Sequence, residues 1–301
     1  MSVRGAAGKR PVSPSDPTLI FNPVPPTRSF PLQSFGPGAA TDFQPQSLQE
    51  IDEKAKTNPI TYYGKEIVYP DMSESLNLSH QSTRRLLEEV ERWEAFTWQN
   101  NNNNEKANYN PTWGFYVFIT SYSETCLAQI PKAMKNWIRA VEGSLKYACR
   151  AAYADEALKR FKLDVILDEL ILANASEDRV REEFRSFIRG LDLYDPPEEP
   201  LGLAGYGESD FMVPPARNVA CFILDENDIS MLAELKFSED PTQDFGDFER
   251  KKLRLIDGTW RRPQFSHKQY RGVRYCPIHS LGRIYQIITL DLNVLEDGFN
   301  A

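Results

Sequence analysis

Hydrophobic positions in the middle and C-terminal parts of the chain recur at spacings that predict alternating strands and helices. Residues 115–119 (FYVFI) and 219–224 (VACFIL) are apolar on both faces, as in strands that helices cover on both sides. Residues 161–167 and 252–257 predict two further strands. The alternation of strands with helices predicts an α+β fold, in which a mixed β-sheet packs against amphipathic helices.

Several segments carry apolar residues at the three-to-four spacing of amphipathic helices. One helix is expected between about residues 79 and 99, and residues 278–290 predict a last helix or strand. Another is predicted from its N-terminal cap at Ser176 to a C-terminal cap at Gly190. The clearest helix has an apolar stripe made of Ile130, Met134, Trp137, Ile138, Val141 and Leu145.

The N-terminal part of the chain lacks this periodicity. Nine of the 21 prolines fall between Pro11 and Pro45, among Ser, Gly and Gln, and such a composition is typical of disordered segments. The predicted organisation is a disordered Pro-rich tail at 1–58, a helical lead-in with an Asn-rich loop at 59–110, and an α+β domain at 111–301.

Composition indicates an ordinary globular protein: the 301 residues are 41% hydrophobic and 26% charged. The four cysteines are scattered singly, which suits a reducing compartment. No apolar run is long enough for a secretory signal or a membrane-spanning helix. We therefore expect a cytoplasmic or nuclear protein that is not bound to a membrane.

Charge is strongly segregated near the C-terminal end. Residues 192–249 hold 15 acidic residues against two basic ones, whereas residues 250–274 hold nine basic residues against one acidic residue. The basic segment could pack against the acidic one, bind a protein partner, or bind single-stranded nucleic acid through cations and interleaved aromatic rings. The predicted binding residues are Arg250, Lys251, Arg254, Arg261, Arg262, Arg271 and Arg274.

Three residues form a weak candidate for catalysis. Asp225 ends a predicted strand, and Glu234 and Lys236 follow it in an E-x-K pattern that loosely resembles metal-dependent PD-(D/E)xK nucleases. In such sites carboxylates hold Mg²⁺ and the lysine assists the attacking water. The alternative is that Asp225 caps a helix together with Asp228, and that Glu234 and Lys236 are solvated.

Three other residues form a weak candidate for a metal site. His267, Cys276 and His279 have the chemistry of Zn²⁺ ligands, and the last two are spaced C-x2-H. No fourth ligand lies nearby in the sequence. The alternative is a core cysteine beside a hydrogen-bonded histidine, and we expect no cofactor.

Several short motifs resemble a large, uncharacterised family of filamentous ascomycete proteins. They lie between about residues 112 and 290 and are WGFY at 113–116, the helix around Trp137, the helix start at 175–184, CFILDE at 221–226 and LIDGTW at 255–260. The resemblance implies a fungal, intracellular protein with one folded module. Such proteins are often accessories of lineage-specific or secondary-metabolite pathways.

Together these features predict a non-catalytic interaction or regulatory module. A protein partner is the first expectation, and nucleic acid is the second, through the segment 250–274. The alternative function is that of a divergent metal-dependent nuclease or a nucleic-acid-binding protein.

Overall fold

The structure of the chain is a computed structural model, and it describes ten stretches of the sequence. These are residues 31–40, 44–58, 60–62, 65–66, 83–92, 112–146, 148–191, 216–239, 241–260 and 270–290. The Asn-rich loop, the part of the acidic segment at 192–215, and the first 30 residues lie outside them. Among the helices in these stretches, none has the length and apolar character needed to span a bilayer.

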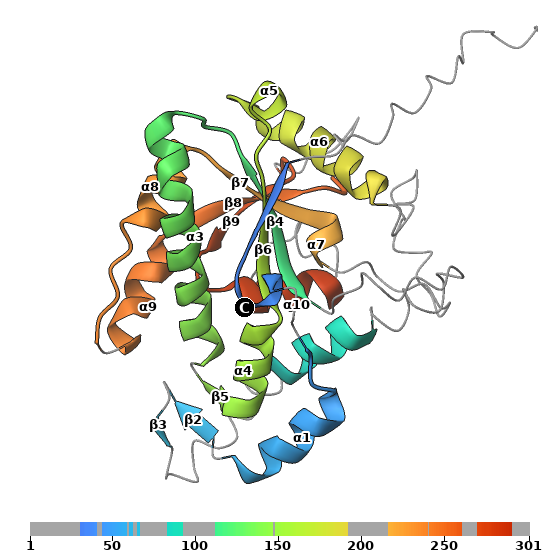
Figure 1. The fold of residues 1–301 in the computed structure, drawn as a ribbon, viewed down its shortest axis with the longest axis vertical. Coiled ribbons are helices and arrows are strands. Elements are labelled where there is room, and N and C mark those ends of the chain that lie inside the picture. The colour runs from blue at the N-terminus through green and yellow to red at the C-terminus, as the bar shows by residue number, and fades with distance from the viewer. Residues whose placement is uncertain are drawn as a thin grey trace, which may run out of the picture.

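A six-stranded mixed sheet with the order β1-β6-β4-β7-β8-β9 forms the centre of the fold (Figure 1). Its strands are β1 (Leu32–Phe35), β4 (Trp113–Ile119), β6 (Phe161–Ile166), β7 (Ala220–Leu224), β8 (Lys252–Asp257) and β9 (Val273–Pro277). β4 pairs in parallel with β6 and β7, whereas the pairings of β1 with β6, β7 with β8, and β8 with β9 are antiparallel. The predicted α+β fold with a mixed sheet is confirmed.

Helices cover both faces of this sheet. They are α1 (Leu48–Thr57), a helix at 83–92, α3 (Glu124–Leu145), α4 (Ala151–Lys159), α5 (Glu169–Leu172), α6 (Glu177–Gly190), α7 (Ala216–Val219), α8 (Glu226–Ala233), α9 (Pro241–Arg250) and α10 (Leu281–Leu290). α3, α4, α8 and α10 contribute to the core on one face, and α5 and α6 contribute to the core on the other. We call these the α3 face and the α6 face (Figure 1).

β4 lies between β6 and β7 in the middle of the sheet, and its side chains enter the cores on both faces. On the α3 face, Phe115 meets Phe222 of β7 edge to face, with ring centroids 5.2 Å apart. On the α6 face, Tyr116 meets Phe187 in the same way at 4.8 Å. Such aromatic pairs add to the free energy gained from burial alone. The strand predicted at 115–119 is confirmed, and all of its residues are buried.

The predicted helix starts are largely confirmed by their caps. Ser176 caps α6, and its side chain accepts a hydrogen bond from the backbone N–H of Arg179. The predicted C-terminal cap at Gly190 is wrong by one residue. Gly190 is the last residue of α6, and Leu191 follows it with a φ of −75°, so the helix ends without a left-handed residue.

Part of the predicted disordered tail is folded. β1 pairs along its length with β6, and the short 3-10 turn η1 (Pro37–Ala39) follows it. α1 begins with a complete capping box between Ser47 and Glu50, and its Ile51 is fully buried in the main core. The prediction that all of 1–58 is disordered is therefore wrong for these elements, because partners distant in the sequence order them.

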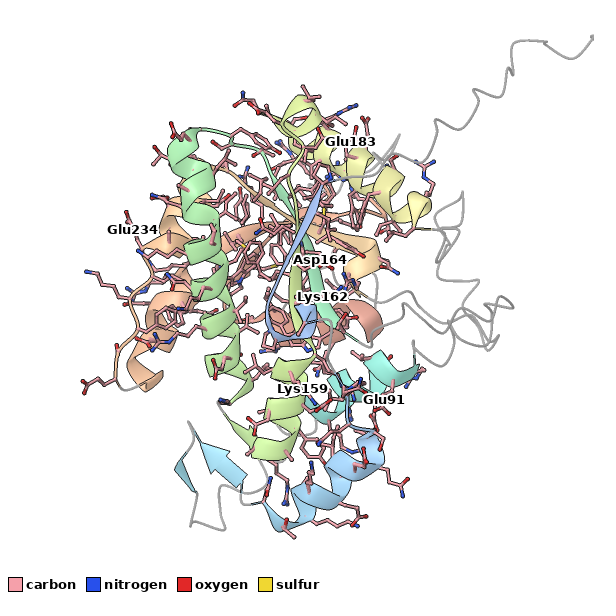
Figure 2. The ribbon with its side chains drawn as sticks, viewed as in Figure 1. Glu91, Lys159, Lys162, Asp164, Glu183 and Glu234 are labelled. Atoms are coloured by element: carbon pink, nitrogen blue, oxygen red, sulfur yellow. The ribbon has the colours of Figure 1, made fainter. Side chains whose placement is uncertain are left out.

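Two kinds of contact hold this N-terminal segment. Gly36 and Gly38 let the backbone approach Phe161 and Arg160 so closely that an added Cβ atom at either would lie 2.7 Å from a carbonyl oxygen. Buried Arg160 then binds the segment through the carbonyl of Gln46. Figure 2 shows Glu91, another partner of Arg160, beside this region. The apolar content of 1–58 does not reveal these contacts.

Several short elements were not predicted. They are α4, α5, α7, α9, β9 and a small second sheet of β3 (Lys65–Glu66), β2 (Ile60–Tyr62) and β5 (Ala148–Arg150). β9 escapes recognition because Arg274 and a terminal proline, Pro277, interrupt its apolar pattern. The last element, predicted as a helix or strand at 278–290, is the helix α10.

Candidate functional site

Asp225 follows β7 and forms the N-terminal cap of α8. Its Oδ1 accepts hydrogen bonds from the backbone N–H groups of Asn227 and Asp228 at 2.9 and 3.1 Å. Asp228 completes the capping box by accepting from the backbone N–H of Asp225 at 3.1 Å. Arg254 of β8 then donates from Nη2 to both carboxylates, at 2.7 and 2.9 Å. Asp225 is therefore bound by a helix end and a guanidinium.

Glu234 and Lys236 do not join Asp225 in one site. Glu234 is the C-terminal cap of α8, and this helix of eight residues separates it from Asp225 by about 12 Å. Both Glu234 and Lys236 are exposed to solvent. The arrangement in which Asp225 caps a helix with Asp228 is the one that the structure shows, and the three candidate catalytic residues do not converge.

The candidate metal ligands Cys276 and His279 lie in different environments. Cys276 lies on β9 with its side chain in the core of the α3 face, and burial raises the pKa of its thiol. His279 lies near the surface end of the same core, with Nε2 3.4 Å from a carboxylate oxygen of Glu249. Burial lowers the pKa of His279 despite this neighbour. The third candidate, His267, lies outside the described residues.

No group of three or more His, Cys, Asp or Glu side chains within the described stretches is arranged to hold a metal ion. Burial also raises the pKa of Cys221 and, to a smaller extent, that of Cys126. A raised pKa keeps a thiol protonated at neutral pH, and the protonated thiol is a poor nucleophile and a poor ligand. Cys126, Cys221 and Cys276 therefore act as core residues.

The predicted basic binding residues gather along β8 and β9. We call this set of residues the basic strip, and it consists of Arg250, Lys251, Lys252, Arg254, Arg271, Arg274 and Tyr275. Arg274 lies opposite Leu255, and therefore on the other face of the sheet from Arg254 and Tyr275. Arg261 and Arg262 lie outside the described residues. Arg254 is the member that forms ion pairs with the acidic segment, through Asp225 and Asp228. In the described part of the chain, no carboxylate forms an ion pair with Arg250, Lys251, Lys252 or Arg271.

Two arginines of α6 fix the far end of the basic strip. Arg181 donates from Nε to the carbonyl of Asp257 at 3.0 Å and from Nη2 to the carbonyl of Arg271 at 3.1 Å. Arg185 donates from Nε to the carbonyl of Gly258 at 2.6 Å. The carbonyls of Asp257 and Gly258 lie at the end of β8, and that of Arg271 lies just before β9. α6 therefore binds both the end of β8 and the start of β9.

A ring stack places the guanidinium of Arg274. It lies over the ring of Tyr270, 4.6 Å from the ring centroid, and the Tyr270 hydroxyl donates to Asp257 Oδ2 at 3.2 Å. Burial raises the pKa of Asp257, although hydrogen bonds from Thr259 and Tyr270 oppose the shift. Arg274 is therefore held in place by a cation–π contact.

Tyr275 and the backbone of β9 complete the basic strip. The register places Tyr275 directly opposite Arg254, so both lie on the α6 face of the sheet, and Lys252 lies on that face two residues away. Tyr275 is 63% exposed, which is unusual for an aromatic side chain in a strand. Within the described residues, β9 is an edge strand with β8 as its one neighbour. The strip thus combines cations, an exposed ring and the edge strand of the described sheet.

A second polar cluster was not predicted from the sequence. Lys162 and Asp164 on β6 point to the α6 face, where Arg217 of α7 and Ser34 of β1 meet them. The available signal was the alternation of these two charged residues with apolar ones in a strand of a central sheet. Charged side chains are rarely buried without a partner, so this pattern marks an ion-paired cluster.

No known protein family, no curated protein and no solved structure gives a significant match to this chain.

Proposed function

We propose that this chain is a non-catalytic interaction module that binds an acidic, extended segment of a partner protein along β9. The observation that carries the proposal is the basic strip, in which four cations lack a carboxylate partner among the described residues beside an open strand edge. An added strand would bond to the backbone groups on the side of β9 that has no neighbouring strand among the described residues, and its acidic side chains would face the cations.

The ion pairs among the described residues favour an external partner for the basic strip over pairing with the acidic segment of the same chain. The acidic segment reaches the basic strip through Asp225 and Asp228, and both of these bind Arg254. Asp244, another member of that segment, accepts hydrogen bonds from Ser238 instead. The remaining cations keep their attraction for an incoming anionic chain, which would speed its association and fix its register.

The module is also assigned a cellular location and a role in this proposal. On the motifs that resemble filamentous ascomycete proteins, we place it in the cytosol or nucleus of a fungal cell, as an accessory of a lineage-specific pathway. The separation of Asp225 from Glu234 and Lys236 disfavours the alternative of a nuclease. Binding of single-stranded nucleic acid would use the same cations with Tyr275 as a stacking ring, and it is an outcome of the test below.

The test measures binding of two fluorescent probes to the full chain by anisotropy. One probe is a peptide of alternating Glu and Val residues, and the other is single-stranded DNA of 20 nucleotides. The variant Lys252→Glu/Arg271→Glu reverses two charges of the basic strip. The control Lys132→Glu/Lys135→Glu makes the same change of charge on the exposed side of α3.

We expect the peptide to bind the wild type, and its affinity to fall at least tenfold in the strip variant, or about 1.4 kcal/mol. The α3 control should bind as the wild type does. Binding of DNA but not of peptide, with a steep dependence on salt, would replace the proposal by a nucleic-acid surface. Failure of the wild type to bind either probe, or equal loss in the α3 control, would overturn it.

A further inference from the structure

The polar cluster on the α6 face is built around one buried carboxylate. Asp164 of β6 is 2% exposed, and it accepts a hydrogen bond from the Ser34 hydroxyl at 2.5 Å. Its Oδ2 forms ion pairs with Lys162 Nζ at 3.2 Å and with Nη2 of Arg217. Figure 2 shows Lys162 and Asp164 next to each other on the central part of the sheet.

Arg217 is held in this position by two further contacts. Its guanidinium lies over the ring of Tyr116, 4.5 Å from the centroid, and its Nη1 is 3.5 Å from Thr112 Oγ1. The side chain of Arg217 is 11% exposed and that of Lys162 is 22% exposed. The cluster therefore lies within the protein and reaches solvent mainly through the lysine.

The charges of this cluster do not balance. Lys162 and Arg217 are two cations, and Asp164 is the one carboxylate among the described residues that pairs with either of them. Because both cations contact the same oxygen of Asp164, they lie close to each other. Burial, followed by the charge of Arg217, lowers the pKa of Lys162 more than Asp164 raises it. Among the described residues, one positive charge in the cluster is thus left without a carboxylate partner, and buried charges are costly unless paired.

We propose that this cluster is a binding site for a carboxylate group of a small organic acid, which would bridge Lys162 Nζ and the Arg217 guanidinium. Lysine keeps two N–H donors beyond the one directed at Asp164, and arginine carries five donors in a planar fork that suits a carboxylate. A single negative charge would neutralise the excess. A phosphate monoester, which carries close to two charges, would leave an uncompensated negative charge beside Asp164.

The contrary explanation is that the cluster only fastens β1 and α7 to the sheet, since Ser34 and Arg217 belong to those elements. A purely structural cluster would be disturbed by the loss of Lys162 to the same extent with or without added carboxylate. A binding site would give a response that saturates with carboxylate concentration and depends on Lys162.

The experiment follows the melting temperature of the full chain in rising sodium acetate, propionate or benzoate, at constant ionic strength set with sodium chloride. Sodium phosphate is a parallel series. The variant is Lys162→Met, and the matched control is Lys132→Met, which removes an exposed lysine from α3. A ligand that binds only the folded state raises its stability as concentration exceeds the dissociation constant.

We expect at least one carboxylate to raise the melting temperature saturably in the wild type and in Lys132→Met, with the midpoint concentration moved at least tenfold upward in Lys162→Met. A saturable response to phosphate alone would overturn the assignment to carboxylates. Equal responses in wild type and Lys162→Met, or no saturable response to any of the three acids, would overturn the site itself.

A second measurement does not depend on folding of the variant. NMR titration of lysine Nζ groups in the wild type should show one lysine with a lowered pKa, and saturating carboxylate should raise that pKa while the pKa values of exposed lysines stay constant. An unchanged pKa for that lysine would contradict the proposal.

Discussion

Replacing Arg160 by methionine is expected to lower the free energy of unfolding and to loosen the N-terminal segment. The Arg160 side chain is 1% exposed and donates from Nε to Glu156 Oε1 at 2.9 Å. Its Nη2 donates to the carbonyl of Gln46 and lies 3.3 Å from Glu91 Oε1. Glu156 in turn accepts from the backbone N–H of Gln46 at 3.0 Å. One guanidinium thus joins α4, the helix at 83–92 and the segment before α1.

The expected loss of unfolding free energy in Arg160→Met depends on the groups that lose their partner. Removing one partner of a buried ion pair costs about 3 to 5 kcal/mol, because the other partner stays buried and charged. Arg160 Nη1 is buried without a hydrogen-bond partner among the described residues, and such a donor costs about 1 to 3 kcal/mol in the native protein. Methionine removes that penalty as well, so we expect a net loss of about 2 kcal/mol.

Urea denaturation measures the loss, and limited proteolysis shows where it acts. We expect cleavage between residues 40 and 58 to accelerate in Arg160→Met, with a smaller m-value if the segment is released before the rest unfolds. The control is Arg179→Met, which removes an exposed arginine with ion pairs on α6 and should cost no more than about 1 kcal/mol. Equal losses for the two variants, with unchanged cleavage, would refute the reasoning about burial.

Two further predictions concern local geometry and pH. Gly114 has a φ of +132°, and a Cβ atom there would lie 1.8 Å from the carbonyl oxygen of Lys162, so Gly114→Ala should cost more than about 3 kcal/mol in urea denaturation. Gly143→Ala in α3 meets open space and should gain about 0.5 to 1 kcal/mol; a similar loss for both would contradict the steric argument. Burial lowers the pKa of His279 in the folded protein, so folding favours the neutral side chain. The contribution of this side chain to stability is complete above its unfolded pKa of about 6.5, and it is lost as the pH falls through its pKa in the folded protein. The melting temperature of His279→Gln should therefore fall less between pH 7.5 and 5.5 than that of the wild type, and an equal fall would show that another group controls this range.

The sequence was sufficient for elements whose apolar pattern is long or two-sided. β4, α3, α6 and β7 were predictable because each buries a continuous stripe or both of its faces. β1 and α1 were not, since their order depends on β6, Gly36 and Arg160, and none of these is adjacent in the chain. Local composition reports how much apolar surface a segment carries, and it does not report whether a distant strand accepts its backbone hydrogen bonds.

The candidate sites show the same division. The cap formed by Asp225 and Asp228 was predictable because both partners lie within one helical turn. The ion pairs from Arg254 to that cap join residues 26 and 29 positions apart, and the pairing of Asp164 with Arg217 spans 53 positions. Charge segregation along the chain located the basic strip, and the antiparallel register of β8 and β9 determines which of its side chains share a face.

The two edges of the sheet pose the strongest objection to a binding role for the basic strip. Natural edge strands often carry lysine simply to prevent edge-to-edge aggregation, and the strip is at such an edge. The opposite edge strand, β1, has the pattern LQSF, which contains no charge, and its Leu32 is 45% exposed. Protection against aggregation is therefore not applied uniformly in this sheet. The two explanations, protection and binding, also differ in the sign of charge that they require. Any charge would protect an edge strand, whereas only positive charge would attract an acidic segment. The Lys252→Glu/Arg271→Glu variant keeps the number of charges and inverts them, so a monomeric variant that has lost the peptide would support binding over protection.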